Sequence, residues 1–69
     1  MWKIIDKNVV SQGFSQGQFI SATEAPVEFF EIREVKENGN ISAVSTLFRD
    51  YKIIFPEQDL LDARWWIMD

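Results

Sequence analysis

The sequence predicts an all-β fold, a small five-stranded antiparallel barrel with a short 3₁₀ turn before its last strand. Three observations predict it: an Asn38-Gly39 pair, a β-branched run at residues 41–48, and apolar alternation at residues 51–55 and 63–68. Runs of this length, separated by turn signals, are typical of small β domains.

The first part of the chain is expected to form two short strands joined by a polar loop. Trp2 and Ile4 fit the first strand, and residues 19–22 fit the second. Residues 11–19 contain a near-tandem Ser-Gln-Gly unit, and we interpret them as a loop because Gly and Ser favour turns. Phe14 lies inside this loop and is expected to turn back into the core.

Residues 27–37 are interpreted as a strand that forms a hairpin with the run after it. Their apolar side chains form no stripe at helical spacing, whereas they divide between the two sides of a strand. Asn-Gly is a strong hairpin signal because both central residues of a type I′ turn have positive φ. A two-residue loop would place Phe30 opposite Leu47 and Phe29 opposite Phe48.

The C-terminal segment has two interpretations. In one, residues 57–69 form a helix, favoured by acidic side chains in its first turn, and the fold is α+β, an antiparallel sheet covered by a C-terminal helix. In the other, residues 56–61 form a 3₁₀ turn and a last strand follows, with Ala63, Trp65 and Ile67 pointing inward.

The second interpretation resembles the closing part of SH3-like small barrels, in which a short helical turn precedes a last strand near the first. The resemblance covers this tail and the strand spacing. It implies a five-stranded SH3-like barrel in which Trp2 and Ile4 pack against Trp65 and Ile67, and we prefer it because pairing would protect the terminal strands.

The composition fits one small domain, residues 1–69, and excludes several kinds of chemistry. Seven Lys and Arg against 11 Asp and Glu give a net charge of −4, and the chain has no His and no Cys. Without Cys there is no thiolate nucleophile, disulfide or Cys-ligated metal, and without His there is no imidazole base or ligand. We therefore expect no enzymatic activity, no metal and no cofactor.

The charged motifs have structural explanations. Asp59 and Asp62 lack the spacing of a calcium loop and are expected to flank a helical turn. An acidic series recurs through the middle of the chain, and we interpret it as a charged sheet edge that discourages aggregation. The alternative is an acidic mimic that blocks a nucleic-acid-binding protein. The members of the series are Glu24, Glu28, Glu31, Glu34 and Glu37.

The cations and the apolar runs bear on partners and location. The seven Lys and Arg residues are scattered singly, which argues against a nucleic-acid partner. No apolar run approaches the ~20 residues that span a bilayer, so no membrane partner is expected. Asp6 and Lys7 interrupt the first apolar segment, so it is no signal peptide, and we expect a cytoplasmic protein.

The aromatic residues are the candidate binding residues. Six Phe, three Trp and one Tyr exceed what so small a core can hide. If Trp65 points inward, Trp66 points outward and is either exposed for binding or packed under a loop. The candidate partner-binding residues are Trp66, Trp65, Trp2, Tyr51 and Phe14.

These observations favour a non-enzymatic cytosolic protein–protein interaction module, acting as a regulator, an inhibitor or an assembly subunit. Its partner would be another protein, with a homo-oligomer as an alternative. The competing hypothesis is single-stranded nucleic-acid binding through an aromatic face, since bases stack on aromatic rings.

Overall fold

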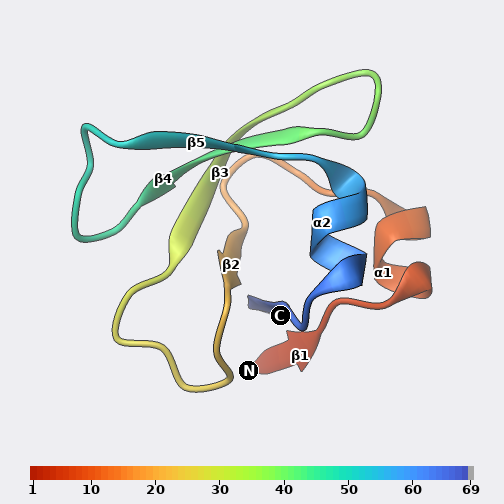
Figure 1. The fold of residues 1–69 in the computed structure, drawn as a ribbon, viewed down its shortest axis with the longest axis horizontal. Coiled ribbons are helices and arrows are strands. Elements are labelled where there is room, and N and C mark those ends of the chain that lie inside the picture. Colours follow the sequence, from red (N-terminus) through yellow and green to blue (C-terminus); the bar gives the residue numbers. More distant parts are fainter. Residues whose placement is uncertain (69) are drawn as a thin grey trace.

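The computed structural model describes residues 1–68 and shows one six-stranded antiparallel sheet with two short helices (Figure 1). The elements in chain order are β1 (Trp2–Ile4), α1 (Lys7–Gln12), β2 (Phe19–Ser21), β3 (Phe30–Val35), β4 (Ile41–Ser45), β5 (Lys52–Phe55), α2 (Glu57–Asp62) and β6 (Trp66–Met68).

The sheet is open rather than closed into the predicted barrel. Its strand order is β1-β6-β2-β3-β4-β5, so β1 and β5 are its edges. The prediction of a closed five-stranded SH3-like barrel is therefore wrong in both closure and strand number, whereas the predominance of antiparallel β-structure is confirmed. Closure would require the two edge strands to pair, and α2 instead runs between β5 and the final strand (Figure 1).

The C-terminal segment contains a short helix followed by a strand. Strand β6 pairs with β1, and Ile4 lies opposite Trp66. The predicted order of a helical turn and then a last strand beside the first is confirmed, so the single helix over residues 57–69 is wrong. The turn is α-helical rather than 3₁₀. Ala63 is exposed rather than inward, because it caps α2 and precedes β6.

Helix α1 lies where a strand end and a loop were expected. The Asp6 carboxylate accepts a hydrogen bond of 3.0 Å from the Val9 N–H, which caps the helix N-terminus. Gly13 ends the helix with φ 85°, and its N–H donates to the Val10 carbonyl. Val9 is buried, so one side of this short helix packs on the core.

The β3–β4 hairpin is confirmed, but its register differs from the prediction. Lys36 N–H donates to the Asn40 carbonyl at 2.8 Å, so the loop holds three residues instead of two. A bulge between Ile32 and Glu34 shifts the pairing by one more residue. Phe30 consequently lies opposite Ser45 rather than Leu47.

The core lies between one face of the sheet and the two helices. The strands and helices supply buried side chains to it, and Phe14 joins them from the polar loop as predicted. Phe30 and Trp65 pack against the core residue Phe55, and the centroids of the three rings lie 5.0–6.1 Å apart. The buried apolar residues are Ile5, Val9, Phe14, Ile20, Ile32, Ile41, Ala43, Phe55, Leu60 and Ile67.

Candidate interaction surface

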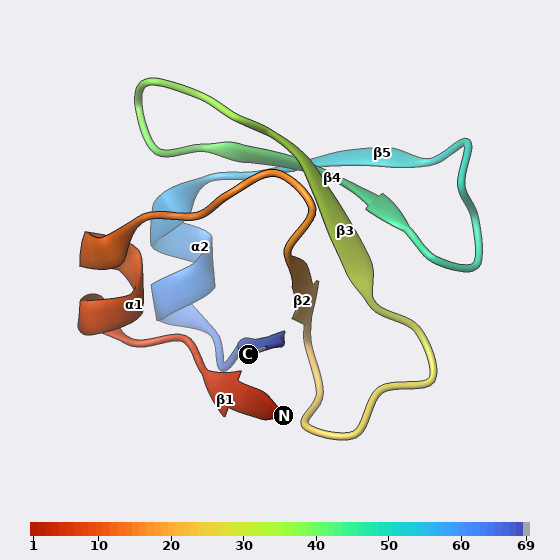
Figure 2. The same cartoon turned by 180° about the vertical axis from the view of Figure 1, so that it is seen from behind.

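The two faces of the sheet differ in what covers them. Both helices lie on the core side, as the front and back views agree (Figures 1 and 2). Directly opposed residues of antiparallel strands point to the same face, and neighbours along a strand point to opposite faces. Since Ile20 and Ile67 point into the core, Phe19, Trp66 and Trp2 point to the other face, here called the outer face.

Aromatic rings gather on the outer face at the end formed by β1, β6 and β2. The Phe29 ring contacts Trp2 at 5.5 Å and Phe19 at 5.2 Å between centroids, both edge to face. Trp66 lies on the same face, between Ile4 and Ser21 in the ladder. We call Trp2, Phe19, Phe29 and Trp66 the outer aromatic cluster.

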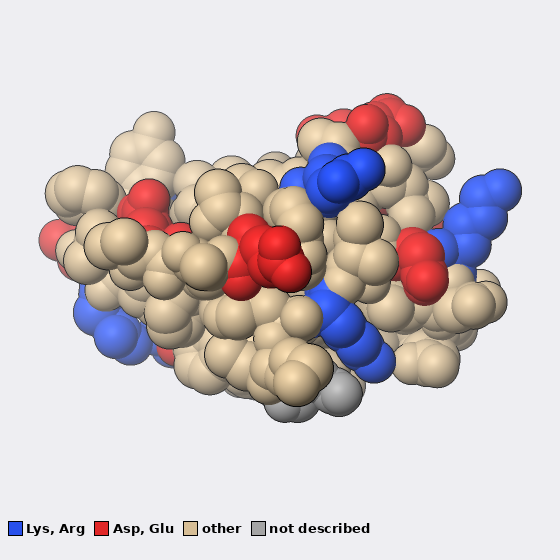
Figure 3. Space-filling view, turned by 90° about the horizontal axis from the view of Figure 1, so that it is seen from below, with Lys and Arg blue, Asp and Glu red and all other residues tan. Residues whose placement is uncertain are grey.

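The members of this cluster are half-buried, and one of them, Trp66, lies opposite Ser21 of β2. Ser21 is completely buried, and its hydroxyl donates to the Thr23 carbonyl at 2.6 Å while accepting from the Thr23 N–H at 2.9 Å. Ile4 and Met68 border the cluster, with 44% and 36% of their surface exposed. Residues other than Lys, Arg, Asp and Glu make up most of the side shown in Figure 3, and its acidic and basic side chains are scattered over it.

The structure separates the five candidate residues predicted from the sequence. Trp2 and Trp66 belong to the outer face, whereas Trp65 packs against the core on the opposite face. Phe14 is buried, and Tyr51 lies beyond the sheet in the loop between β4 and β5. The alternation of Trp65 and Trp66 is confirmed, but Trp66 is half-buried rather than exposed because strands flank it on both sides.

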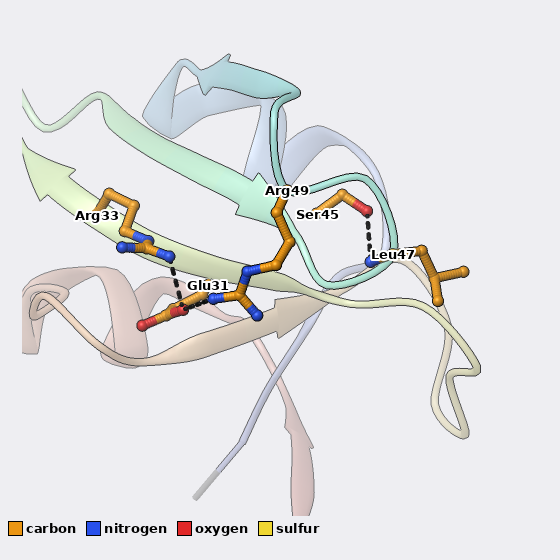
Figure 4. A network of polar contacts seen from close by, with 5 residues as sticks. All are labelled: Glu31, Arg33, Ser45, Leu47 and Arg49. Carbon is orange, nitrogen blue, oxygen red and sulfur yellow. Dashed lines mark hydrogen bonds and ion pairs between the residues drawn. The ribbon is translucent and has the colours of Figure 1, made fainter.

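A charged group adjoins the aromatic cluster on the outer face. Glu31 lies opposite Phe19, and its carboxylate contacts Arg33 at 3.3 Å and Arg49 at 3.8 Å (Figure 4). Both guanidinium groups are well exposed, so each pair contributes only about 0–1 kcal/mol to stability. These contacts hold the guanidinium groups of Arg33 and Arg49 beside the outer aromatic cluster, although the chain as a whole is acidic.

The loop at residues 46–51 displays three large side chains, the predicted candidate Tyr51 and two apolar residues that were not among the candidates, Leu47 and Phe48. The Ser45 hydroxyl donates to the Glu28 carboxylate and accepts the Leu47 and Phe48 N–H groups, each at 3.2 Å (Figure 4 shows the Leu47 contact). Tyr51 N–H donates to the Phe48 carbonyl at 2.9 Å. The exposed fractions of Leu47, Phe48 and Tyr51 are 58%, 65% and 65%.

Phe19, Phe29, Leu47 and Phe48 are the surface residues that the sequence analysis did not select. Phe19 could have been found by alternation, since it precedes Ile20 in a short strand. Phe29 could not, because it lies outside the regular strands and reaches Trp2 across the sheet.

Residues 1–68 contain no detectable cavity and no group of three or more side chains suited to a metal. In that same part of the chain, neither helix has the length and apolar character needed to cross a membrane.

Comparison with known proteins gives no match: no protein-family model, no curated protein and no solved structure is significantly similar to the chain.

Proposed function

We propose that this chain is a non-enzymatic cytosolic interaction module that binds another protein through the outer aromatic cluster. The observation that carries the proposal is the placement of both helices on one face of the sheet, which leaves the aromatic rings of the other face partly open to solvent (Figures 1 and 2). The module would act as a regulator, an inhibitor or an assembly subunit by occupying a surface of its partner.

The physical properties of the cluster suit a protein partner. Tryptophan is among the residues enriched at interface hot spots, where a large ring fills a complementary surface and excludes water. The rings of Trp2, Phe19 and Phe29 already hold one another edge to face. Because these side chains are ordered before binding, they lose less rotamer freedom in the complex than side chains that become fixed only on binding, and more of their contact energy contributes to affinity.

Single-stranded nucleic acid is the second candidate, and one arrangement favours it. Arg33 and Arg49 converge on Glu31 next to the Phe19 ring, so exposed cations border a stacking surface. The ion pairs with Glu31 offset part of this positive charge, and the chain as a whole carries −4. These charges make the protein partner the better supported of the two.

The proposal is tested by comparing affinity capture with wild-type chain and three variants. Trp2→Ala and Trp66→Ala each remove one ring from the cluster, and Phe48→Ala removes an exposed ring outside it. We expect a partner retained by wild type and Phe48→Ala but reduced at least about tenfold in binding by the two Trp variants, since a hot-spot ring contributes about 2 kcal/mol or more. Circular dichroism confirms that each variant is folded.

Equal capture by all four proteins would contradict the proposed surface. The nucleic-acid candidate is tested separately by tryptophan fluorescence with single-stranded oligonucleotides at low salt. Quenching that weakens steeply as salt rises would favour that candidate, and the absence of quenching would exclude it.

A further inference from the structure

Strand β5 is an edge of the sheet whose outer side has no neighbouring strand among residues 1–68. An edge strand presents unpaired N–H and C=O groups that can pair with another strand. Which residues carry those groups follows from the hydrogen bonds of the neighbouring strands, because residues of a strand direct their backbone groups alternately to the two sides.

The hydrogen bonds of β4 show to which neighbouring strand each of its residues directs its backbone N–H and C=O groups. Thr46 N–H donates to the Phe29 carbonyl at 2.9 Å, so Thr46 faces the β3 side. By alternation, the backbone N–H and C=O groups of Ala43 and Ile41 point toward β5, where these residues lie opposite Ile53 and Phe55.

Strand β3 gives the same result independently. Ile32 exchanges backbone bonds of 2.8 Å with Gly17 and Gln18 on the β2 side. Its neighbour Glu31 therefore faces β4, where it lies opposite Val44. Val44 thus faces β3, in agreement with the assignment made from Thr46.

Lys52 and Ile54 therefore direct their N–H and C=O groups to the open edge. Two copies of such an edge can pair antiparallel about a two-fold axis. If Lys52 lies opposite the partner's Ile54, both outward residues of each copy are paired, and each pair exchanges two N–H···O=C bonds. Ile53 then meets the partner's Ile53 on the axis.

The neighbouring registers are worse for physical reasons. If Ile54 faced the partner's Ile54, Lys52 would face the partner's Pro56, which has no N–H to donate. If Lys52 faced the partner's Lys52, two like charges would be directly opposed. One register alone satisfies the outward groups without opposing like charges.

This register also covers apolar surface. On the outer face, the 51%-exposed Ile54 packs against the aliphatic stem of the partner's Lys52. On the core side, Phe55 lies opposite the partner's Tyr51, and Tyr51 is 65% exposed in the single chain. Cross-strand pairs of aromatic and aliphatic side chains stabilise a ladder.

The other edge, β1, lacks this self-complementarity. Ile5 N–H donates to the Trp65 carbonyl at 2.8 Å, so Ile5 and Lys3 face β6 while Trp2 and Ile4 face outward. The corresponding two-fold register would pair Trp2 with the partner's Ile4 and set Lys3 opposite the partner's Lys3. Like charges on the axis disfavour it, and Lys is a common protection of edge strands.

We propose that two copies of this chain associate through their β5 edges, with Lys52 opposite the partner's Ile54, into a symmetric dimer whose two sheets are continuous. The outer aromatic cluster stays uncovered in this dimer because it lies at the opposite end of the strand order. The dimer therefore does not depend on the proposed function, and either can fail alone.

The test is sedimentation velocity over a range of concentrations with paired substitutions at one exposed site. Ile54→Lys places an ammonium group opposite the partner's Lys52 twice in the dimer, and Ile54→Glu places a carboxylate there. We expect the Kd of the dimer to rise at least about fivefold for Ile54→Lys and to fall for Ile54→Glu, with both shifts shrinking at high salt. Ile4→Lys, at the outward position of the other edge, leaves the Kd unchanged.

Amide hydrogen exchange locates the contact. We expect the Lys52 and Ile54 amides to become protected as concentration rises, while the Trp2 and Ile4 amides do not. A chain that stays monomeric at about 1 mM overturns the proposal, because such an interface would be weaker than about 4 kcal/mol at the standard state. A dimer in which the Lys52 and Ile54 amides gain no protection overturns it as well.

Discussion

The Ser45 hydroxyl donates a hydrogen bond to the Glu28 carboxylate, and this contact joins the chain before β3 to the end of β4. The same oxygen accepts the N–H groups of Leu47 and Phe48. One buried hydroxyl therefore holds the start of loop 46–51 and the segment that carries Phe29 into the outer aromatic cluster.

Ser45→Ala is expected to destabilise the protein by about 1–3 kcal/mol, because the half-buried Glu28 carboxylate and two backbone donors lose their hydrogen-bond partner together. The free energy of unfolding from urea titration measures the change. Hydrogen exchange at the Leu47 and Phe48 amides is expected to accelerate in the same variant.

Ser42→Ala is the matched control in the same strand. Ser42 is completely buried, and its hydroxyl has no hydrogen-bond partner among the residues that the structure describes. Removing an unsatisfied buried hydroxyl is expected to leave stability unchanged or to raise it by up to about 1 kcal/mol. A loss as large as that of Ser45→Ala would contradict the different roles assigned to the two hydroxyls.

The hairpin shows how far local sequence signals reach. Asn38-Gly39 locates the turn correctly, and Gly39 has a φ of 87°, a value that favours glycine. Asn38 does not have a positive φ, so the type I′ turn on which the prediction rests is not the turn that forms. The register is not a local property, since it depends on the bulge near Arg33 and on the closing bond between Lys36 and Asn40. The local signals alone predict a two-residue loop, which places Leu47 and Phe48 within the ladder. In the structure both residues lie beyond the end of β4.

The terminal strands and α1 likewise differ in how well local sequence signals predict them. Alternation in residues 63–68 separates Trp65 from Trp66 correctly, because a strand of any length has a period of two. Helix α1 has six residues, which is too short for a helical period to be visible in a window of about 11–18 residues. Only its flanking signals, the Asp6 cap and the Gly13 end, could have revealed it.

Asp6→Ala is expected to destabilise the protein by about 1 kcal/mol, because the Val9 N–H at the start of α1 loses its acceptor. Asp6→Asn retains an acceptor oxygen and serves as the control, with a loss of a few tenths of a kcal/mol at most. Thermal and urea unfolding measure both variants. Equal losses would show that the side chain acts through its charge rather than as a cap.

Leu60→Ala is expected to unfold much of the population, because Leu60 is completely buried and anchors α2 to the core. Truncating a buried Leu costs about 2–5 kcal/mol, a large part of the stability of so small a domain. Leu61→Ala, one residue along the same helix and only half-buried, should cost less. Circular dichroism and urea titration compare the two, and a larger loss at Leu61 would contradict the assigned helix orientation.

Gly39→Ala is expected to destabilise the protein slightly more than Gly17→Ala. Both glycines have positive φ, 87° and 94°, so both substitutions carry a similar backbone cost of about 1 kcal/mol. A methyl group at Gly17 meets open space, whereas one at Gly39 would meet the end of the Glu57 side chain at the start of α2, which must turn aside at a small cost. Adding Glu57→Ala should therefore recover the difference in urea titrations, and a difference that persists in the double variant would show that the steric contact is not its cause.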